Sequence, residues 1–295
     1  MLFLSKRYGR LGNQLIIASH AIASVIDNGH GLVNQAFFDY AEYFEGTVHN
    51  PLCKYPPPSW GLAIPKNVRL RFLRVDLLGK LFSRVPIVSR IYGRESIEIK
   101  VPDGQTLNYQ APDIADNLRT RAVFTDGWCL SNLVGTSTHR SQILRYFRPV
   151  AKYRQQVEET MAKARAGADI VVGVHIRQDD LRHLPDHWFW LFETSDYVHY
   201  MRQMNELLPN KKIRFVVCSD EPQDTKNFEG LSVEFGPGSV IGDLYSLSAC
   251  DYIIASLSTF ARWASYYNGT PLYVIRSKGQ TMSLGEFEVA DLSYD

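Results

Sequence analysis

The second half of the chain alternates short apolar runs with helical patterns, and this alternation constrains the fold most strongly. Five runs rich in β-branched and apolar residues predict strands: 170–176, 213–218, 231–235, 252–256 and 271–275. Four segments predict helices: 153–166, 195–208 with a Ser195 cap, 242–250 and 259–267. Strands that alternate with helices pair in parallel, so we expect an α/β domain with a doubly wound sheet.

The first half begins in the same way and then gives weaker signals. Its expected elements are a strand, a glycine turn, a helix, a second strand and a second helix, at 2–5, 9–14, 15–28, 121–128 and 138–147. Residues 51–65 contain five prolines and indicate an irregular connection. We place the boundary between two α/β domains near Pro149, which gives domains 1–149 and 150–295.

Composition excludes several classes of protein. The 295 residues carry 32 Lys and Arg against 31 Asp and Glu, so no net field of the whole chain favours nucleic acid. The four cysteines are too few and too scattered for a disulfide framework, and their spacing does not suit zinc. No apolar run approaches the roughly 18 residues of a transmembrane helix, and the N-terminus lacks a signal-peptide pattern. We therefore expect a cytoplasmic protein.

Four polar clusters follow predicted strands, where open α/β sheets gather their ligands. They are 9–14 (GRLGNQ), 175–180 (HIRQDD), 219–220 (SD) and 256–260 (SLSTF). Glycines in the first cluster would let a ligand approach the backbone at a helix N-terminus, or they would simply form a βα turn. In the second cluster, the planar fork of Arg177 suits a diphosphate, although an ion pair that fastens the strand to a loop is the alternative.

The remaining two clusters have both a binding and a capping interpretation. Ser219 and Asp220 could hydrogen-bond a base or ribose, or could cap the next element. Ser258 and Thr259 stand where a helix follows a strand, which favours phosphate binding or an ordinary N-cap. Three familiar sites are missing from the sequence: GxSxG, the P-loop pattern and a DxD metal motif, since Asp179 and Asp180 are adjacent. We therefore predict no metal site.

Taken in order, these clusters resemble the motifs of the fucosyltransferase superfamily, particularly bacterial α-1,2-fucosyltransferases, with some features like those of O-fucosyltransferases. The matching residues are Gly9-Arg10-Leu11-Gly12-Asn13-Gln14, His175 with Arg177 and Asp180, Ser219-Asp220, Asp243-Leu244-Tyr245, Ser258-Thr259-Phe260 and, more weakly, Asp126-Gly127-Trp128. The sequence departs from that pattern at Asp179, where the family has glycine, at Leu181 and at Ser256.

The resemblance implies a GT-B architecture, in which two Rossmann-like domains face a central cleft. It also implies a GDP-fucose donor, inversion at the anomeric carbon and no required metal, with the acceptor bound by the N-terminal domain and the nucleotide sugar by the C-terminal one. The residues expected to bind the donor are Gly12, His175, Arg177, Ser219, Asp220, Asp243, Ser258, Thr259 and Phe260. The residues expected to act in catalysis are Arg177, Arg10, Asn13 and Asp180, with Asp126 and Asp180 as candidates for the general base.

Two alternative functions remain open. One is a glycosyltransferase of the same fold that uses another nucleotide sugar. The other is a nucleotide-sugar-binding protein that has lost catalysis, which the presence of both Arg10 and Arg177 disfavours.

Residues 66–100 form a strongly basic segment that the resemblance does not explain. They hold nine basic and three acidic residues, a net charge of +6, while the whole chain carries only +1. Apolar residues recur at helical spacing within the segment, which favours a basic amphipathic helix. Such a helix could lie on the inner face of an anionic membrane and reach a lipid-linked glycan, or its stripe could pack on the N-terminal sheet.

Overall fold

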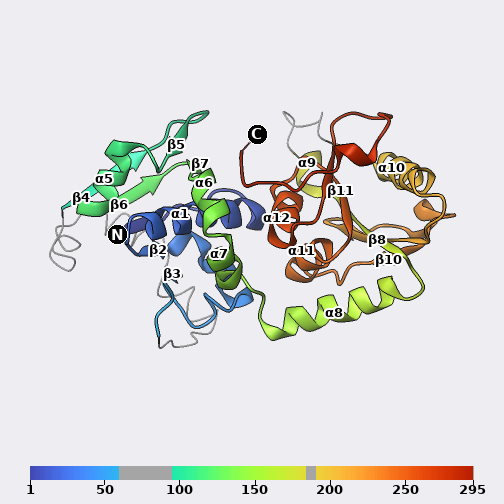
Figure 1. Ribbon diagram of the computed structural model, residues 1–295, viewed down its shortest axis with the longest axis horizontal. Coiled ribbons are helices and arrows are strands. Elements are labelled where there is room, and N and C mark those ends of the chain that lie inside the picture. The colour runs from blue at the N-terminus through green and yellow to red at the C-terminus, as the bar shows by residue number, and fades with distance from the viewer. Residues whose placement is uncertain (60–94, 184–190, 295) are drawn as a thin grey trace. The chain divides into compact units, whose positions relative to one another are not determined.

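The chain divides into two compact α/β units. The computed structural model describes residues 1–59, 95–183 and 191–294, apart from the side chain of Asp180 (Figure 1). The first unit comprises Met1–Val150 and Leu292–Asp295, and the second comprises Ala151–Asp291. The C-terminal tail therefore differs from the sequence expectation, because it joins the first unit rather than the second.

The first unit is built on a five-stranded sheet with the order β3-β2-β1-β6-β4. Its strands are β1 (Leu2–Leu4), β2 (Leu32–Asn34), β3 (Lys54–Tyr55), β4 (Ser96–Lys100) and β6 (Ala122–Asp126). Pairing is parallel except between β2 and β3. A separate parallel pair joins β5 (Thr106–Asn108) to β7 (Cys129–Ser131). The helices are α1 (Leu11–Asp27), α5 (Pro112–Thr120), α6 (Leu133–Thr138), α7 (Arg140–Tyr146) and a 3-10 segment at Gln35–Tyr43.

A buried histidine ties the C-terminal tail to the first unit. His20 lies in α1 and is fully buried. Its Nδ1 accepts a hydrogen bond from the backbone N–H of Asn132 at 2.9 Å, so its Nε2 donates to the carbonyl of Leu292 at 2.8 Å. The hydroxyl of Tyr294 also donates to the carbonyl of Leu130 at 3.1 Å. These contacts join tail and unit across most of the sequence, so no local pattern could predict them.

The second unit has an all-parallel five-stranded sheet with the order β10-β9-β8-β11-β12. Its strands are β8 (Ile170–Ile176), β9 (Ile213–Ser219), β10 (Val233–Phe235), β11 (Tyr252–Ser256) and β12 (Leu272–Ile275). The helices are α8 (Ala151–Arg165), α9 (Asp179–Arg182), α10 (Thr194–Leu207), α11 (Val240–Ser248) and α12 (Thr259–Asn268), with 3-10 turns at Thr225–Phe228 and Leu284–Glu286. The predicted alternation of strands and helices is confirmed here.

Alternation along β8 decides which side chains face which helices. Val172, Val174 and Ile176 pack in one apolar cluster with Tyr197 of α10. On the other face, a side chain at Gly173 would meet Leu247 and Cys250, which lie in and just after α11. Both faces of the strand are covered by helices, which is why its sequence is an unbroken apolar run.

Several helix starts differ from the sequence expectation: α7 begins at Arg140, α8 at Ala151 and α11 at Val240, each two residues from the expected start, and α1 and α10 differ as well. Helix α1 begins at Leu11 rather than at 15, because Gly9 makes the turn with a φ of +63° and Arg10 is the extended N-cap. Helix α10 begins at Thr194 with Glu193 as its cap, so the expected Ser195 cap was wrong. There, Glu193 and Asp196 form a reciprocal capping box, and the N–H of Glu193 donates to Asp196 Oδ2 at 2.8 Å.

The apolar stripe of the predicted basic helix, at 70–85, lies outside the described residues. The described end of the segment, Ser96–Lys100, forms strand β4 and pairs in parallel with β6. Among the described residues, no helix combines the length and apolar character needed to cross a membrane.

Candidate active site

The carboxyl ends of β8, β9 and β11 lie side by side in the second unit. Their register pairs His175 with Cys218 and with Ala255, and pairs Ile176 with Ser219. Three polar clusters from distant parts of the sequence therefore meet at one edge of the sheet, which is the edge where parallel α/β folds bind ligands.

Arg177 connects the end of β8 to the loop between β11 and α12. Its guanidinium Nη1 donates to the carbonyl of Leu257 at 3.3 Å, and its backbone N–H donates to the hydroxyl of Tyr197 at 3.4 Å. That hydroxyl donates in turn to Ser256 Oγ at 3.1 Å. Arg177 is half-buried, so its charge is held in place while part of it faces solvent.

The N-terminus of α12 begins beside this arginine. Ser258 is the N-cap, and its Oγ accepts a hydrogen bond from the N–H of Phe260 at 3.2 Å. The ring of Phe260 stacks on His175, with ring centroids 4.8 Å apart and ring planes inclined by 24°. Thr259 is the first helical residue and is half-buried. A guanidinium next to the positive end of a ten-residue helix suits an anion such as a diphosphate.

Ser219 and Asp220 shape the loops around Arg177. Asp220 Oδ1 accepts hydrogen bonds from the backbone N–H groups of Gln178 at 2.8 Å and of Asp179 at 3.3 Å. Ser219 Oγ accepts from the N–H of Glu221 at 3.2 Å. The structure thus gives both residues the capping contacts that the sequence left as an alternative, and their contact with a ligand stays a prediction.

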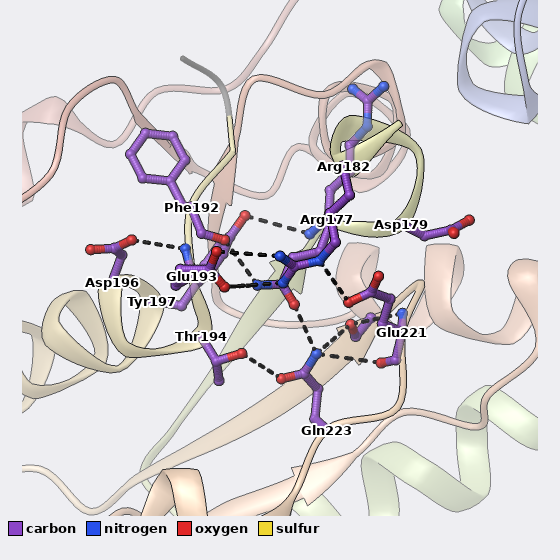
Figure 2. Close-up of polar contacts among 12 residues, drawn as sticks. Arg177, Asp179, Arg182, Phe192, Glu193, Thr194, Asp196, Tyr197, Glu221 and Gln223 are labelled. Carbon is purple, nitrogen blue, oxygen red and sulfur yellow. Dashed lines mark hydrogen bonds and ion pairs between the residues drawn. The ribbon is translucent and has the colours of Figure 1, made fainter. Parts of the chain in front are cut away.

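A polar network behind Arg177 involves two glutamines that sequence reasoning missed. Gln178 is 2% exposed; its Nε2 donates to the carbonyl of Phe192 at 3.0 Å, and its Oε1 accepts from Gln223 Nε2 at 3.1 Å. Gln223 Nε2 also reaches Ser219 Oγ at 3.1 Å. Gln223 Oε1 accepts from the hydroxyl of Thr194 at 2.7 Å (Figure 2). Gln178 stood inside a noted cluster, whereas nothing in the sequence marks Gln223.

Arg182 extends this network toward solvent. Its guanidinium lies 3.0 Å from Glu193 and 3.3 Å from Glu221. Figure 2 labels all three residues. Together with the glutamines, these contacts join the β8–α9 loop, the start of α10 and the loop after β9. The strand end that carries Arg177 is therefore braced from two neighbouring elements.

Asp243 is a buried carboxyl group in the first turn of α11. It is 8% exposed, and its Oδ1 accepts a hydrogen bond from the N–H of Gly238 at 3.0 Å. Burial raises the pKa of Asp243 to about 6. A side chain at Gly236 would come within 2.6 Å of both Asp243 Oδ1 and Cys218 Sγ, so glycine is required for this close approach.

The first unit carries the other predicted site residues. Arg10 is exposed, Gly12 is buried in the first turn of α1, and the amide of Asn13 lies against Gly9. Asp126 ends β6, where its carboxylate accepts from the hydroxyl of Tyr8 and lies 3.4 Å from Lys6 Nζ. Asp180 belongs to α9 in the second unit, with its side chain outside the described part of the chain.

Metal ligation has no support among the residues that the structure describes. None of their His, Cys, Asp or Glu side chains form a group of three or more that could hold an ion. The groups that could instead bind an anionic ligand are the guanidinium of Arg177 and the N–H groups at the N-terminus of α12.

Comparison with known proteins places these motifs in a family context. A sequence model of glycosyl transferase family 11 matches residues 139–288. Nodulation protein Z from Azorhizobium caulinodans is 28% identical over 141 residues, a match that covers 38% of this chain and 43% of that protein. The chain thus spans less than half of this curated relative.

Solved structures resemble the chain over nearly its whole length. A mutant of Arabidopsis thaliana FUT1 in complex with GDP has a TM-score of 0.55 at 14% identity, covering 97% of this chain and 73% of that one. NodZ α-1,6-fucosyltransferase soaked with GDP-fucose gives 0.54 at 17% identity, covering 95% and 97%. POFUT1 in complex with GDP-fucose gives 0.52 at 12% identity, covering 94% and 97%. These likenesses confirm the predicted α/β fold of GT-B type.

The residues matched by the family model lie mostly in the second unit, which also carries Arg177 and the start of α12. The matched residues 139–288 include β8, β9, β11 and the start of α12, whose ends form the arginine-lined edge described above. Because that match covers just over half of the 295 residues, the chain belongs to glycosyl transferase family 11.

Proposed function

We propose that this enzyme transfers L-fucose from GDP-fucose to a hydroxyl group of a glycan, with inversion at the anomeric carbon and without a metal ion. The observation that carries the proposal is the position of Arg177 beside the N-terminus of α12. Of the solved structures of similar fold, POFUT1 is in complex with GDP-fucose and NodZ was soaked with it, which supports this choice of donor.

The leaving diphosphate needs a cationic environment. As the acceptor oxygen attacks the anomeric carbon, the bond from that carbon to the β-phosphate oxygen breaks and negative charge grows on GDP. Arg177 and the N–H group of Thr259 at the start of α12 would stabilise this charge in place of a metal. His175, stacked on Phe260, would hold that helix end in position.

Asp243 would select guanine as the base. Its carboxylate can accept hydrogen bonds from the N1–H and the 2-amino group of guanine, a pair of donors that uracil lacks. Gly236 places no side chain against Asp243 Oδ1, which a Cβ at that position would approach to 2.6 Å. Since its pKa is about 6, Asp243 would be ionised and ready to accept at pH 7.

The acceptor hydroxyl must lose a proton during transfer. Asp126 and Asp180 remain the candidates for the base. Arg10 and Asn13, at the start of α1, would contribute from the first unit.

A donor screen separates this proposal from its alternatives. Thermal unfolding is measured with GDP-fucose, GDP-mannose, UDP-glucose and CMP-sialic acid, each in excess. At a hundredfold excess over Kd, binding of GDP-fucose should raise the melting temperature by about 5–10 °C. Equal or greater stabilisation by a uridine or cytidine donor would overturn the assignment of GDP-fucose, and binding without any donor turnover would favour the inactive binding protein.

Cytoplasmic location and membrane contact through residues 66–100 also belong to the proposal. The cationic excess of that segment would attract it to anionic lipid, giving access to a lipid-linked glycan. Co-sedimentation with anionic liposomes at low and high salt tests this; protein that stays in the supernatant at low salt contradicts it.

A further inference from the structure

We propose that the first unit carries a saccharide subsite in which a pyranose ring stacks on Trp128 and donates a hydroxyl hydrogen bond to Asp126. The identification of this pyranose as part of the acceptor glycan rests on the proposed function. The subsite itself rests on contacts within the first unit.

Trp128 is unusually exposed for a residue of its size. It is 41% exposed, whereas Trp263 in the second unit is fully buried. An aromatic ring left exposed beside polar side chains offers an apolar contact surface to a ligand. A pyranose presents a face of C–H groups that packs on the face of an indole, while its hydroxyl groups remain available for polar partners.

The indole is held in place before any ligand binds. The ring of Tyr8 meets it edge to face, with centroids 6.1 Å apart and planes at 82°. Its Cη2 would lie 3.0 Å from a Cβ at Gly9, so the ring rests over a backbone that carries no side chain. A ring fixed in this way loses little conformational freedom on binding, which favours recognition of a weakly binding sugar.

Polar groups stand next to this ring. Tyr8 contacts Trp128 with its ring and Asp126 with its hydroxyl, so all three residues form one cluster. Gly127, between Asp126 and Trp128, leaves the space that Val101 fills. Asp126 is 27% exposed and lies 3.4 Å from Lys6 Nζ.

The carboxylate of Asp126 has capacity for a further hydrogen bond. Within residues 1–59, 95–183 and 191–294, its side-chain contacts to Tyr8 and Lys6 both use Oδ1. Its Oδ2 can therefore accept from a ligand hydroxyl. One exposed aromatic ring beside a few fixed polar groups is the arrangement that binds a neutral, polyhydroxylated ring, and the negative charge of Asp126 disfavours an anionic one.

Saturation-transfer difference NMR on the full chain tests the subsite directly. The probes are four methyl glycosides at millimolar concentration: β-D-galactoside, β-D-glucoside, N-acetyl-β-D-glucosaminide and α-D-mannoside. The variants are Trp128→Ala, Trp128→Leu, which keeps apolar bulk without a flat face, and Val134→Ala as the matched control, since Val134 is 65% exposed in the same unit.

At least one glycoside should receive saturation from the wild type and from Val134→Ala. Both Trp128 variants should bind it about fivefold more weakly or worse, because losing an aromatic anchor costs more than about 1 kcal/mol. The shift in melting temperature caused by GDP should be the same in all four proteins.

Two results would overturn the subsite: no glycoside binds the wild type, or a folded Trp128 variant binds as well as the wild type. Should Trp128→Ala not fold, Trp128→Leu makes the same comparison. The two proposals fail separately. If GDP does not bind the wild type, the proposed donor is refuted, but pyranoside binding that depends on Trp128 still supports the subsite.

Discussion

Replacing Arg177 with alanine removes the guanidinium that lies beside Leu257 and the start of α12. Nη1 donates a hydrogen bond to the Leu257 carbonyl at 3.3 Å, so the guanidinium is held at the strand end. A unit charge about 4 Å from a phosphate oxygen contributes about 4 kcal/mol at an effective dielectric constant of 20. If the transition state loses this electrostatic stabilisation, kcat/KM should fall about a hundred- to a thousandfold.

The assay is GDP release from GDP-fucose, measured as kcat/KM. Arg177→Lys should recover little activity, because an ammonium group lacks the planar fork that binds two oxygens at once. Arg202→Ala is the matched control: Arg202 is an exposed residue of α10, and its loss changes the net charge equally. Arg177→Ala that keeps over half of the wild-type kcat/KM, with an unchanged melting temperature, would refute the role of Arg177.

Three further predictions follow from the same site. The pKa of Asp243 is about 6 in the folded protein, against an ordinary value of 3.8. The folded state therefore binds this proton more tightly than the unfolded state does. The protein should lose about 3 kcal/mol of stability as the pH rises from 4 through 6. Asp243→Asn should remove that loss in urea titrations across this range, and an unchanged pH slope would contradict the burial argument. Asp220→Ala should raise KM for the donor and lower the free energy of unfolding by about 1 kcal/mol, because two backbone N–H groups lose their acceptor. Asp220→Asn keeps an acceptor oxygen and should restore both the KM and the stability. A donor KM that does not change in Asp220→Ala would refute the bracing of Arg177. Transfer should survive excess EDTA, and activity lost on chelation and restored by Mn²⁺ or Mg²⁺ would overturn the metal-free mechanism.

The second unit could be predicted from the sequence because its strands are covered on both faces. The run at 170–176 predicted β8 with the bounds that the structure shows, since every position in it except the first is buried. The ends of such strands meet at one edge, so the meeting of His175, Ser219 and Ser256 also followed from the order of the elements.

The middle of the first unit could not be predicted in this way. Its strands β2 and β5 have three residues each, and β4 has an exposed or half-buried side chain at every position. Such strands leave no long apolar run and little alternation to detect. The 3-10 segment at Gln35–Tyr43 likewise has no distinctive pattern.

The residues that support the site were harder to predict than those that form it. Arg177 and Ser258 stand at strand or helix ends, where chemistry is expected, whereas Tyr197 lies among the apolar residues of α10 and would pass for core. Tyr8 and Asp126 are 118 residues apart in the sequence. Contacts of this kind depend on the tertiary fold, and no spacing in the sequence encodes them.

The most direct test follows GDP-β-L-fucose and the purified enzyme by NMR, with water as acceptor and EDTA present. Inverting transfer by the Arg177 site predicts that GDP and free fucose appear together, that the first fucose formed is the α anomer, and that Arg177→Ala slows both at least a hundredfold. A β anomer as first product, or turnover of a uridine donor in preference to GDP-fucose, would contradict the proposed reaction.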